Sequence, residues 1–201
     1  MIHPAAIVHE NAQVDDSAEI GPYAIIDEHV TLGANCELSP HVHLTGHTAI
    51  GAENRFHTGC VIGDAPQDLK YSDEPTRLII GERNLFREHV TIHRSNTPDE
   101  DTRIGAENFF MANSHVGHNA IIGNKVILAN GALVGGHAMI GDGAFLSGNA
   151  VVHQFCRGWR VRHDAGLRRG EPRPAAIHDR ARHQRHVRPQ QRRPQARRFL
   201  R

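Results

Sequence analysis

A bulky apolar residue recurs at every sixth position through most of the chain, and this period is the feature that most limits the possible fold. It fits neither a 3.6-residue helix nor an ordinary two-sided strand, but it fits short strands joined by tight corners. Small residues follow many of these anchors at the fourth position, as expected where the walls of a coil converge. The anchors are Ile2, Val8, Val14, Ile20, Ile26, Leu32, Leu38, Leu44, Ile50, Phe56 and Ile62, then Ile80, Phe86 and Ile92, then Ile104, Phe110, Val116, Ile122, Leu128, Val134, Ile140, Leu146 and Val152.

Three hexads make one triangular coil, so residues 18 apart stack on one face at the strand spacing of about 4.8 Å. Repeats of this kind form parallel β-helices. We therefore predict an all-β fold, a β-helix over residues 1–156. Two segments, 63–79 and 93–103, interrupt the period and are expected to be loops ejected from the coil. Such loops on a rigid scaffold are the usual place for function.

Charge divides the chain at the point where the hexads stop. Residues 1–156 carry eight Lys and Arg against 19 Asp and Glu, a net charge of −11. Residues 157–201 carry 15 Arg and three acids, a net charge of +12, and contain no hexad. This second segment is predicted to be an irregular tail. Its basic composition alone would favour a disordered or nucleic-acid-binding arm.

The remaining composition points to a protein of a reducing compartment. Cys36, Cys60 and Cys156 are too scattered for a disulfide framework or a zinc site and are expected to be buried. No apolar run reaches membrane-spanning length, and Met1 leads directly into the patterned sequence without a signal peptide. We expect a soluble cytoplasmic protein without membrane insertion.

Four histidines share one phase of the repeat. Val116, Val134 and Val152 lie 18 apart, and the imidazoles flank them closely, at His115, His118, His137 and His153. A solvated face can tolerate single histidines, but a shared phase favours a site. Parallel coils would space these rings along a ridge, and no carboxylate or thiolate joins them at ligand spacing, so a metal is disfavoured. An imidazole is well suited to act as a general base on a hydroxyl group.

Five motifs resemble, in order and spacing, the family of acyl-[acyl-carrier-protein]–UDP-N-acetylglucosamine O-acyltransferases. They are Gln67-Asp68-Leu69-Lys70-Tyr71, Glu74-Pro75-Thr76-Arg77, Thr91-Ile92-His93-Arg94, His115-Val116-Gly117-His118 and Val152-His153-Gln154-Phe155. The resemblance covers residues 1–156 and implies a left-handed β-helix. It further implies transfer of a 3-hydroxyacyl group from acyl carrier protein to the sugar 3-hydroxyl, the first step of lipid A synthesis. The family works as a homotrimer with clefts between neighbouring prisms, and needs no cofactor besides the carrier-protein thioester.

The same resemblance assigns roles to individual positions. His118 corresponds to the catalytic base, and Gly136 to the residue whose backbone N–H stabilises the oxyanion. Asp68 corresponds to a ligand of a sugar hydroxyl and Lys70 to a nearby cationic contact, although an exposed ion pair between the two is the alternative. The other expected substrate-binding residues are Gln67, His93, His115, His137, His153 and Gln154.

One position departs from the family pattern. The family often carries an acid directly after the base, but this chain has Asn119. An amide can orient the imidazole by hydrogen bonding, yet it supplies no charge. We expect His118 to remain the base.

The tail has a second interpretation once the family is considered. When residues 157–200 are back-translated and read one nucleotide later, the result can resemble the family's own continuation into another coil and a C-terminal helical region. We predict a single-base frameshift near codon 157. Such a tail would remove residues that bind nucleotide and acyl carrier protein, and activity would then be low. Sequencing codons 150–165 and measuring the intact mass against 22.3 kDa test this.

Three rivals remain. The sibling N-acyltransferase that acts on UDP-3-O-acylglucosamine shares fold and chemistry, but the Gln67–Tyr71 and Val152–Phe155 motifs favour the O-acyltransferase. An inactive or ice-binding solenoid would need ranks of Thr-x-Thr, and the chain contains none. A nucleic-acid-binding role would rest on the Arg-rich tail alone, and we expect no such partner.

Overall fold

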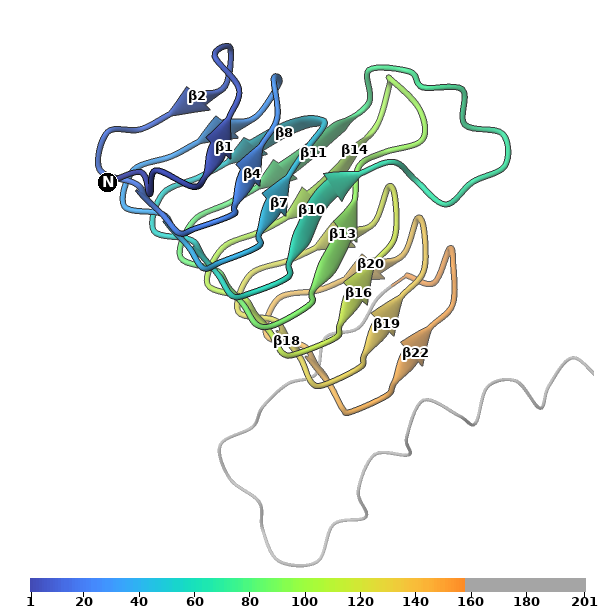
Figure 1. Cartoon of the computed structure of the whole chain (residues 1–201). Helices are drawn as coiled ribbons and strands as arrows, with labels where there is room; N and C mark the ends of the chain where they lie inside the picture. The colour runs from blue at the N-terminus through green and yellow to red at the C-terminus, as the bar shows by residue number, and fades with distance from the viewer. Residues whose placement is uncertain (158–201) are drawn as a thin grey trace, which may run out of the picture. The chain divides into compact units, whose positions relative to one another are not determined.

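A computed structural model describes residues 1–157, which form a parallel β-helix of short strands arranged in three sheets. Figure 1 shows the coils stacked one on another, with strands of the three sheets forming the walls. Every pairing between strands is parallel and joins residues of successive coils. The period of six therefore corresponds to one wall and the period of 18 to one coil, as predicted.

The strands follow one another from wall to wall. The first sheet consists of β1 (Ile7–Val8), β4 (Ile25–Ile26), β7 (His43–Leu44), β10 (Val61–Asp64), β13 (Thr91–His93), β16 (His115–Val116), β19 (Leu133–Val134) and β22 (Val151–Val152). The second consists of β2 (Gln13–Val14), β5 (Thr31–Leu32), β8 (His47–Ile50), β11 (Arg77–Ile80), β14 (Asp101–Ile104), β17 (Ile121–Ile122) and β20 (Met139–Ile140). The third consists of β3 (Glu19–Ile20), β6 (Glu37–Leu38), β9 (Arg55–Phe56), β12 (Leu85–Phe86), β15 (Phe109–Phe110), β18 (Ile127–Leu128) and β21 (Phe145–Leu146).

The core is a column of anchor side chains inside the coils. Val116, Val134 and Val152 are in register on adjacent strands, and all three are buried. Burial of such side chains stabilises the fold by about 1.5–3 kcal/mol each. The residue beside each anchor on its strand faces outward, so only one side chain of every two-residue strand enters the core.

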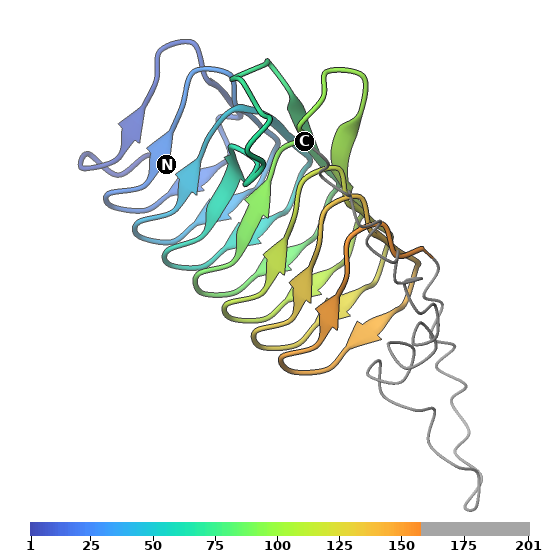
Figure 2. The ribbon, with the colours of Figure 1, turned by 90° about the vertical axis from the view of Figure 1, so that its right-hand side faces the viewer.

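Two loops leave the same corner of the coil, between the first and second sheets. The first connects β10 to β11 and spans residues 65–76, and the second connects β13 to β14 and spans residues 94–100. Both are shorter than predicted because the flanking strands lengthen by pairing with each other, β10 with β13 and β11 with β14. Figure 2 shows both loops on one side of the stack.

Arg94 ties the two loops to the coil. Its Nη1 donates to the carbonyl oxygen of Gly63 at 2.9 Å, and its Nε donates to the hydroxyl of Tyr71 at 3.2 Å. The guanidinium also lies 5.5 Å from the centre of the Tyr71 ring, a favourable cation–π geometry. The base of the first loop is therefore anchored beside the second.

The cysteine prediction is correct for two residues and wrong for the third. Cys36 and Cys60 are buried, and burial raises the pKa of the Cys60 thiol to about 12. Cys156 is only half-buried, because it lies at a corner of the last described coil.

The described part of the chain contains no helix of the length and apolarity needed to cross a membrane. Arg157 still pairs with Met139. The rest of the predicted tail, residues 158–201, lies outside the described residues, so its irregular structure and its frameshift origin stay predictions.

Candidate active site

A hollow of about 340 Å³ opens where the corner of the later coils meets the first loop. Three successive turns line it, and they follow β16, β19 and β22 at the same position of the repeat. One part is polar and one part is apolar. The lining residues include seven predicted ones, Gln67, His93, His115, His118, Gly136, His153 and Gln154, together with Gly117, Leu133, Val134, Gly135, Val151 and Val152.

The imidazole of His118 faces the backbone of Gly136 on the next coil. A Cβ atom added to Gly136 would lie 2.9 Å from both Nε2 and Cε1 of His118, so the edge of the ring bearing Nε2 points at this glycine. The N–H of Gly136 donates to no acceptor within residues 1–157. A Cβ on Gly117 would lie 2.8 Å from that nitrogen and would cover it. Glycines at both positions thus leave a basic nitrogen and a free N–H side by side.

Asn119 sets the protonation of the His118 ring. The Oδ1 atom of Asn119 lies 2.9 Å from Nδ1 of His118 and accepts the backbone N–H of Asn96 at 3.0 Å. Because a backbone N–H can only donate, this edge of the amide is its carbonyl. Nδ1 of His118 therefore carries the proton in the neutral ring, and Nε2 keeps its lone pair facing Gly136.

His115 and His93 form the buried wall of the hollow. The two rings meet edge to face, 4.8 Å apart between centroids, and Oγ1 of Thr91 lies 2.8 Å from Nδ1 of His115. Burial is the main cause that lowers the pKa of His115 to about 4, and the neighbouring His93 is the second. Burial also lowers the pKa of His93. Both rings are neutral near pH 7 and can bind a substrate by hydrogen bonds without carrying charge.

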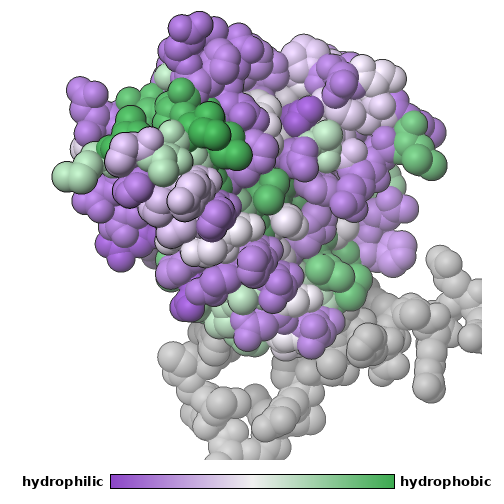
Figure 3. Space-filling model, in the orientation of Figure 1, coloured by the Kyte–Doolittle hydropathy of each residue, from purple (hydrophilic) through white to green (hydrophobic). Residues whose placement is uncertain are grey.

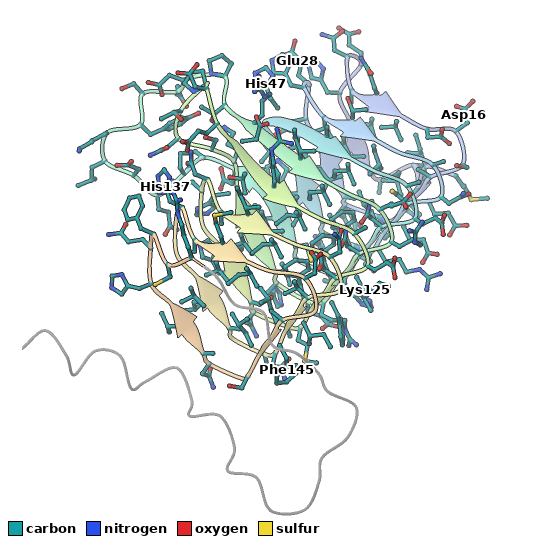
Figure 4. All side chains as sticks on the ribbon, turned by 180° about the vertical axis from the view of Figure 1, so that it is seen from behind. Asp16, Glu28, His47, Lys125, His137 and Phe145 are labelled. Carbon is teal, nitrogen blue, oxygen red and sulfur yellow. The ribbon has the colours of Figure 1, made fainter. Side chains whose placement is uncertain are left out.

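His137, like Asp68 and Lys70, is not among the residues that line the hollow. It has a φ of 56° at its turn, and its ring packs edge-on against His118 at 5.2 Å and stacks on Phe155 at 4.7 Å. Its Nδ1 lies 3.6 Å from Oε2 of Glu100. Figure 4 shows His137 at the corner of the coil beside the loops. In this structure it supports the His118 ring.

Asp68 of the first loop is held beside the site by a hydrogen bond from Asn96 of the second loop. Oδ2 of Asp68 accepts a hydrogen bond from Nδ2 of Asn96 at 2.8 Å. Oδ1 accepts a hydrogen bond from the backbone N–H of Lys70 at 3.0 Å. Both hydrogen bonds lower the pKa of Asp68, and the one from the backbone of Lys70 has the larger effect. No ion pair joins the Asp68 and Lys70 side chains in the described structure, so that alternative is not observed.

Sequence reasoning missed three residues that organise the site. Thr91 contacts His115, Asn96 joins the two loops, and Glu100 accepts the Nδ2 hydrogen of Asn119 at 2.8 Å. The register offered one signal, because Thr91 lies one coil before His115 on the same face. No comparable signal marked Asn96 or Glu100, since the second loop has no repeat.

The hollow also has an apolar part. Leu133 and Val151 point outward from β19 and β22, and 42% and 51% of their surfaces are exposed. They are paired in register on adjacent strands. Figure 3 shows a small hydrophobic patch in the region of these strands, separate from the larger hydrophobic patch over the first coils at the upper left.

Comparison with known proteins finds similarity to the coil in sequence and in fold. Residues 101–136 match the Bacterial transferase hexapeptide (six repeats) family. Over 157 residues the chain is 56% identical to the acyl-[acyl-carrier-protein]–UDP-N-acetylglucosamine O-acyltransferase of Paraburkholderia xenovorans, covering 78% of this chain and 60% of that relative. The β-helix is therefore similar in sequence to this O-acyltransferase.

Solved structures of UDP-N-acetylglucosamine acyltransferases have the same fold. The UDP-N-acetylglucosamine O-acyltransferase of Moraxella catarrhalis is 43% identical with a TM-score of 0.75, covering 78% of this chain and 61% of that one. The Francisella novicida UDP-N-acetylglucosamine acyltransferase is 42% identical with a TM-score of 0.76, covering 78% and 58%. This likeness confirms the left-handed β-helix predicted from the family resemblance. The chain spans about three fifths of the length of these O-acyltransferases.

Proposed function

We propose that this protein transfers a 3-hydroxyacyl group from acyl carrier protein to the 3-hydroxyl of UDP-N-acetylglucosamine. The observation that carries the proposal is the pair formed by Nε2 of His118 and the free N–H of Gly136, which lie side by side in a hollow. A lone-pair nitrogen next to an unused backbone donor is the arrangement that acyl transfer to a hydroxyl group requires.

In the proposed reaction, His118 accepts a proton in the first step and returns it in the second. Nε2 of His118 takes the proton of the sugar hydroxyl while that oxygen attacks the thioester carbonyl carbon. The negative charge that forms on the carbonyl oxygen is stabilised by the N–H of Gly136. Collapse of the tetrahedral intermediate breaks the C–S bond, and the departing thiolate takes the proton back from His118. The products are the sugar ester and the free thiol of the carrier protein.

The two kinds of lining fit the two substrates. Gln67, His93, His115, His153 and Gln154 present hydrogen-bonding groups suited to a sugar nucleotide, and Asp68 and Lys70 lie in the loop beside them. The exposed side chains of Leu133 and Val151 are suited to an acyl chain. The hollow is open to one side, which supports an assembly in which the neighbouring prism of a homotrimer closes it. The proposed setting is the cytoplasm, where acyl carrier protein and nucleotide sugars are found.

The test is a transfer assay on the purified full chain. A panel of 3-hydroxyacyl carrier proteins of different chain length is incubated with UDP-N-acetylglucosamine, and the acylated sugar nucleotide is measured by mass spectrometry. The H118A variant should lose activity by about a thousandfold or more, because the base is removed. The H3A variant, altered at an exposed histidine in the first coil, is the matched control and should keep wild-type turnover.

Other results would overturn the proposal. They are the absence of transfer with every acyl chain, equal activity of H118A and wild type, and a preference for a glucosamine amine as acceptor. The last result would identify the sibling N-acyltransferase reaction.

A further inference from the structure

Glu100 is connected to the proposed base, His118, through the side-chain amide of Asn119. The Oε2 atom of Glu100 accepts a hydrogen bond from Nδ2 of Asn119 at 2.8 Å. Oδ1 of the same Asn119 accepts a hydrogen bond from Nδ1 of His118 at 2.9 Å. Oε2 also lies 3.6 Å from Nδ1 of His137, whose ring packs edge-on against His118. The carboxylate of Glu100 therefore contacts both residues that hold the His118 ring.

The chemistry of these contacts is directional. A carboxylate can only accept, so Glu100 requires the NH₂ edge of Asn119 to face it. The backbone N–H of Asn96 requires the carbonyl edge on the opposite side. Both contacts select the same orientation of the amide, which keeps the proton on Nδ1 of His118. The negative charge of Glu100 is then aligned behind the ring that becomes positive when Nε2 takes a proton.

The backbone at position 119 readily accommodates an amide. Asn119 has a φ of 56°, in the left-handed region where Asn is among the favoured non-glycine residues, and it is buried. A neutral side chain suits this buried position. The charge is placed instead on Glu100, whose side chain is 59% exposed and stays hydrated.

We propose that Glu100 is a positioning residue, which acts through Asn119 to orient the His118 ring and to supply the negative charge that favours its protonated form during transfer. The proposal rests on the proposed function, in which His118 is the base. It adds a carboxylate, drawn from the second loop, that the motif around the base lacks.

Other charged groups also face His118. Asp68 interacts with it electrostatically, and the rings of His93, His115 and His137 lie near it. Asp68 connects to Asn119 only through the side chain and backbone of Asn96, a longer path than that from Glu100. Substitutions at Glu100 therefore test the charge with the shorter connection.

The first experiment compares E100Q with D99N in the transfer assay. Glutamine keeps the shape and an acceptor for Asn119 but removes the charge. We expect kcat to fall by about three- to tenfold with KM within about twofold, since an exposed charge acts here at some distance. D99N removes the same charge from an exposed neighbour on the same loop and should stay within about twofold of wild type. Equal kcat values for E100Q and D99N would overturn the proposal.

Rescue separates charge from loop structure. In the E100Q background, N119D places a carboxylate directly against Nδ1 of His118 and should restore kcat to within about threefold of wild type. If the folded double variant stays as slow as E100Q or slower, Glu100 does not act by its charge. Thermal unfolding of each variant verifies that the fold is retained.

A spectroscopic test does not depend on turnover. In the full chain labelled with ¹⁵N-histidine, the signals of His118 are assigned by their loss in H118Q. Wild type should show the Nδ1-protonated tautomer, and E100A should show a smaller fraction of it, because the amide of Asn119 then loses one of its two orienting contacts. An unchanged fraction in E100A would reject the orienting role, whether or not acyl transfer is detected.

Discussion

The site leaves no room for a side chain at Gly136. A Cβ atom here would come within 2.9 Å of Nε2 and Cε1 at the end of the movable His118 ring, and within 3.2 Å of the backbone carbonyl oxygen of His118. The ring can swing aside at little cost to the fold, but it then leaves the position from which it acts on a hydroxyl group. The glycine is therefore required for chemistry more than for folding.

The G136A variant should consequently separate activity from stability. We expect kcat to fall by about a hundred- to a thousandfold, because the added Cβ displaces the His118 base, while the melting temperature changes by only about 2 °C. G148A is the matched control, because its added Cβ would meet only the carbonyl oxygen of Asn130 at an ordinary 3.5 Å. Steady-state kinetics and thermal unfolding measure the two effects. Near-normal kcat in G136A would show that catalysis does not require the His118 ring to lie against Gly136.

At the scale of elements, the third sheet contains a stack of three aromatic rings. Phe86 on β12 lies parallel to Phe56 on β9 at 4.6 Å and to Phe110 on β15 at 4.9 Å between centroids. All three are buried. The central ring joins three successive coils at the level of the two ejected loops, where the hexad period is interrupted. Aromatic contacts of this kind add to the stabilisation from buried area.

F86A should therefore destabilise the β-helix strongly. We expect the free energy of unfolding to fall by about 3–5 kcal/mol, because the cavity left behind is bounded by rigid walls on all three sides. F145A removes the same side chain from an outward-facing position, 42% exposed and far from His137 in Figure 4, and should cost about 1 kcal/mol or less. Urea unfolding followed by circular dichroism compares them. Similar losses in both variants would mean that the ring stack contributes little.

At the scale of the whole β-helix, buried histidines make stability depend on pH. The pKa values of His93 and His115 are lowered mainly by burial, that of His115 to about 4. In the unfolded chain these rings take up protons near their ordinary pKa of about 6.5. The unfolded state therefore binds more protons between about pH 6.5 and 4, and the stability present above pH 6.5 is lost progressively as the pH falls through this window.

The H115N variant should reduce this dependence. Between pH 7 and pH 5 its melting temperature should fall by about 3 °C less than that of wild type, because one proton-binding group of the unfolded state is gone. H3N, at an exposed histidine, should follow wild type and serves as the control. Differential scanning calorimetry at the two pH values provides the comparison. If H115N and wild type lose stability in parallel, burial of His115 is not the cause.

The sequence by itself determined the coil and the register of the site. An anchor at every sixth residue is a local signal repeated many times, so the spacing alone places Val116, Val134 and Val152 on one wall and their flanking histidines at one corner. The resemblance to the family then assigned His118 and Gly136 to their positions. Both lie in the hollow, as do five of the other predicted residues.

The orientation of the His118 ring depends on contacts that exist only in the folded chain. The contacts from Glu100 and Asn96 to Asn119 come from a loop without a period, and a loop conformation depends on partners distant in the sequence. His137 flanks the same corner as the other histidines, yet its ring stacks on Phe155 and does not line the hollow. A repeat determines which residues stack, because each coil copies the one before it. The loop contacts have no counterpart in the neighbouring coils, so they are set only when the chain is folded.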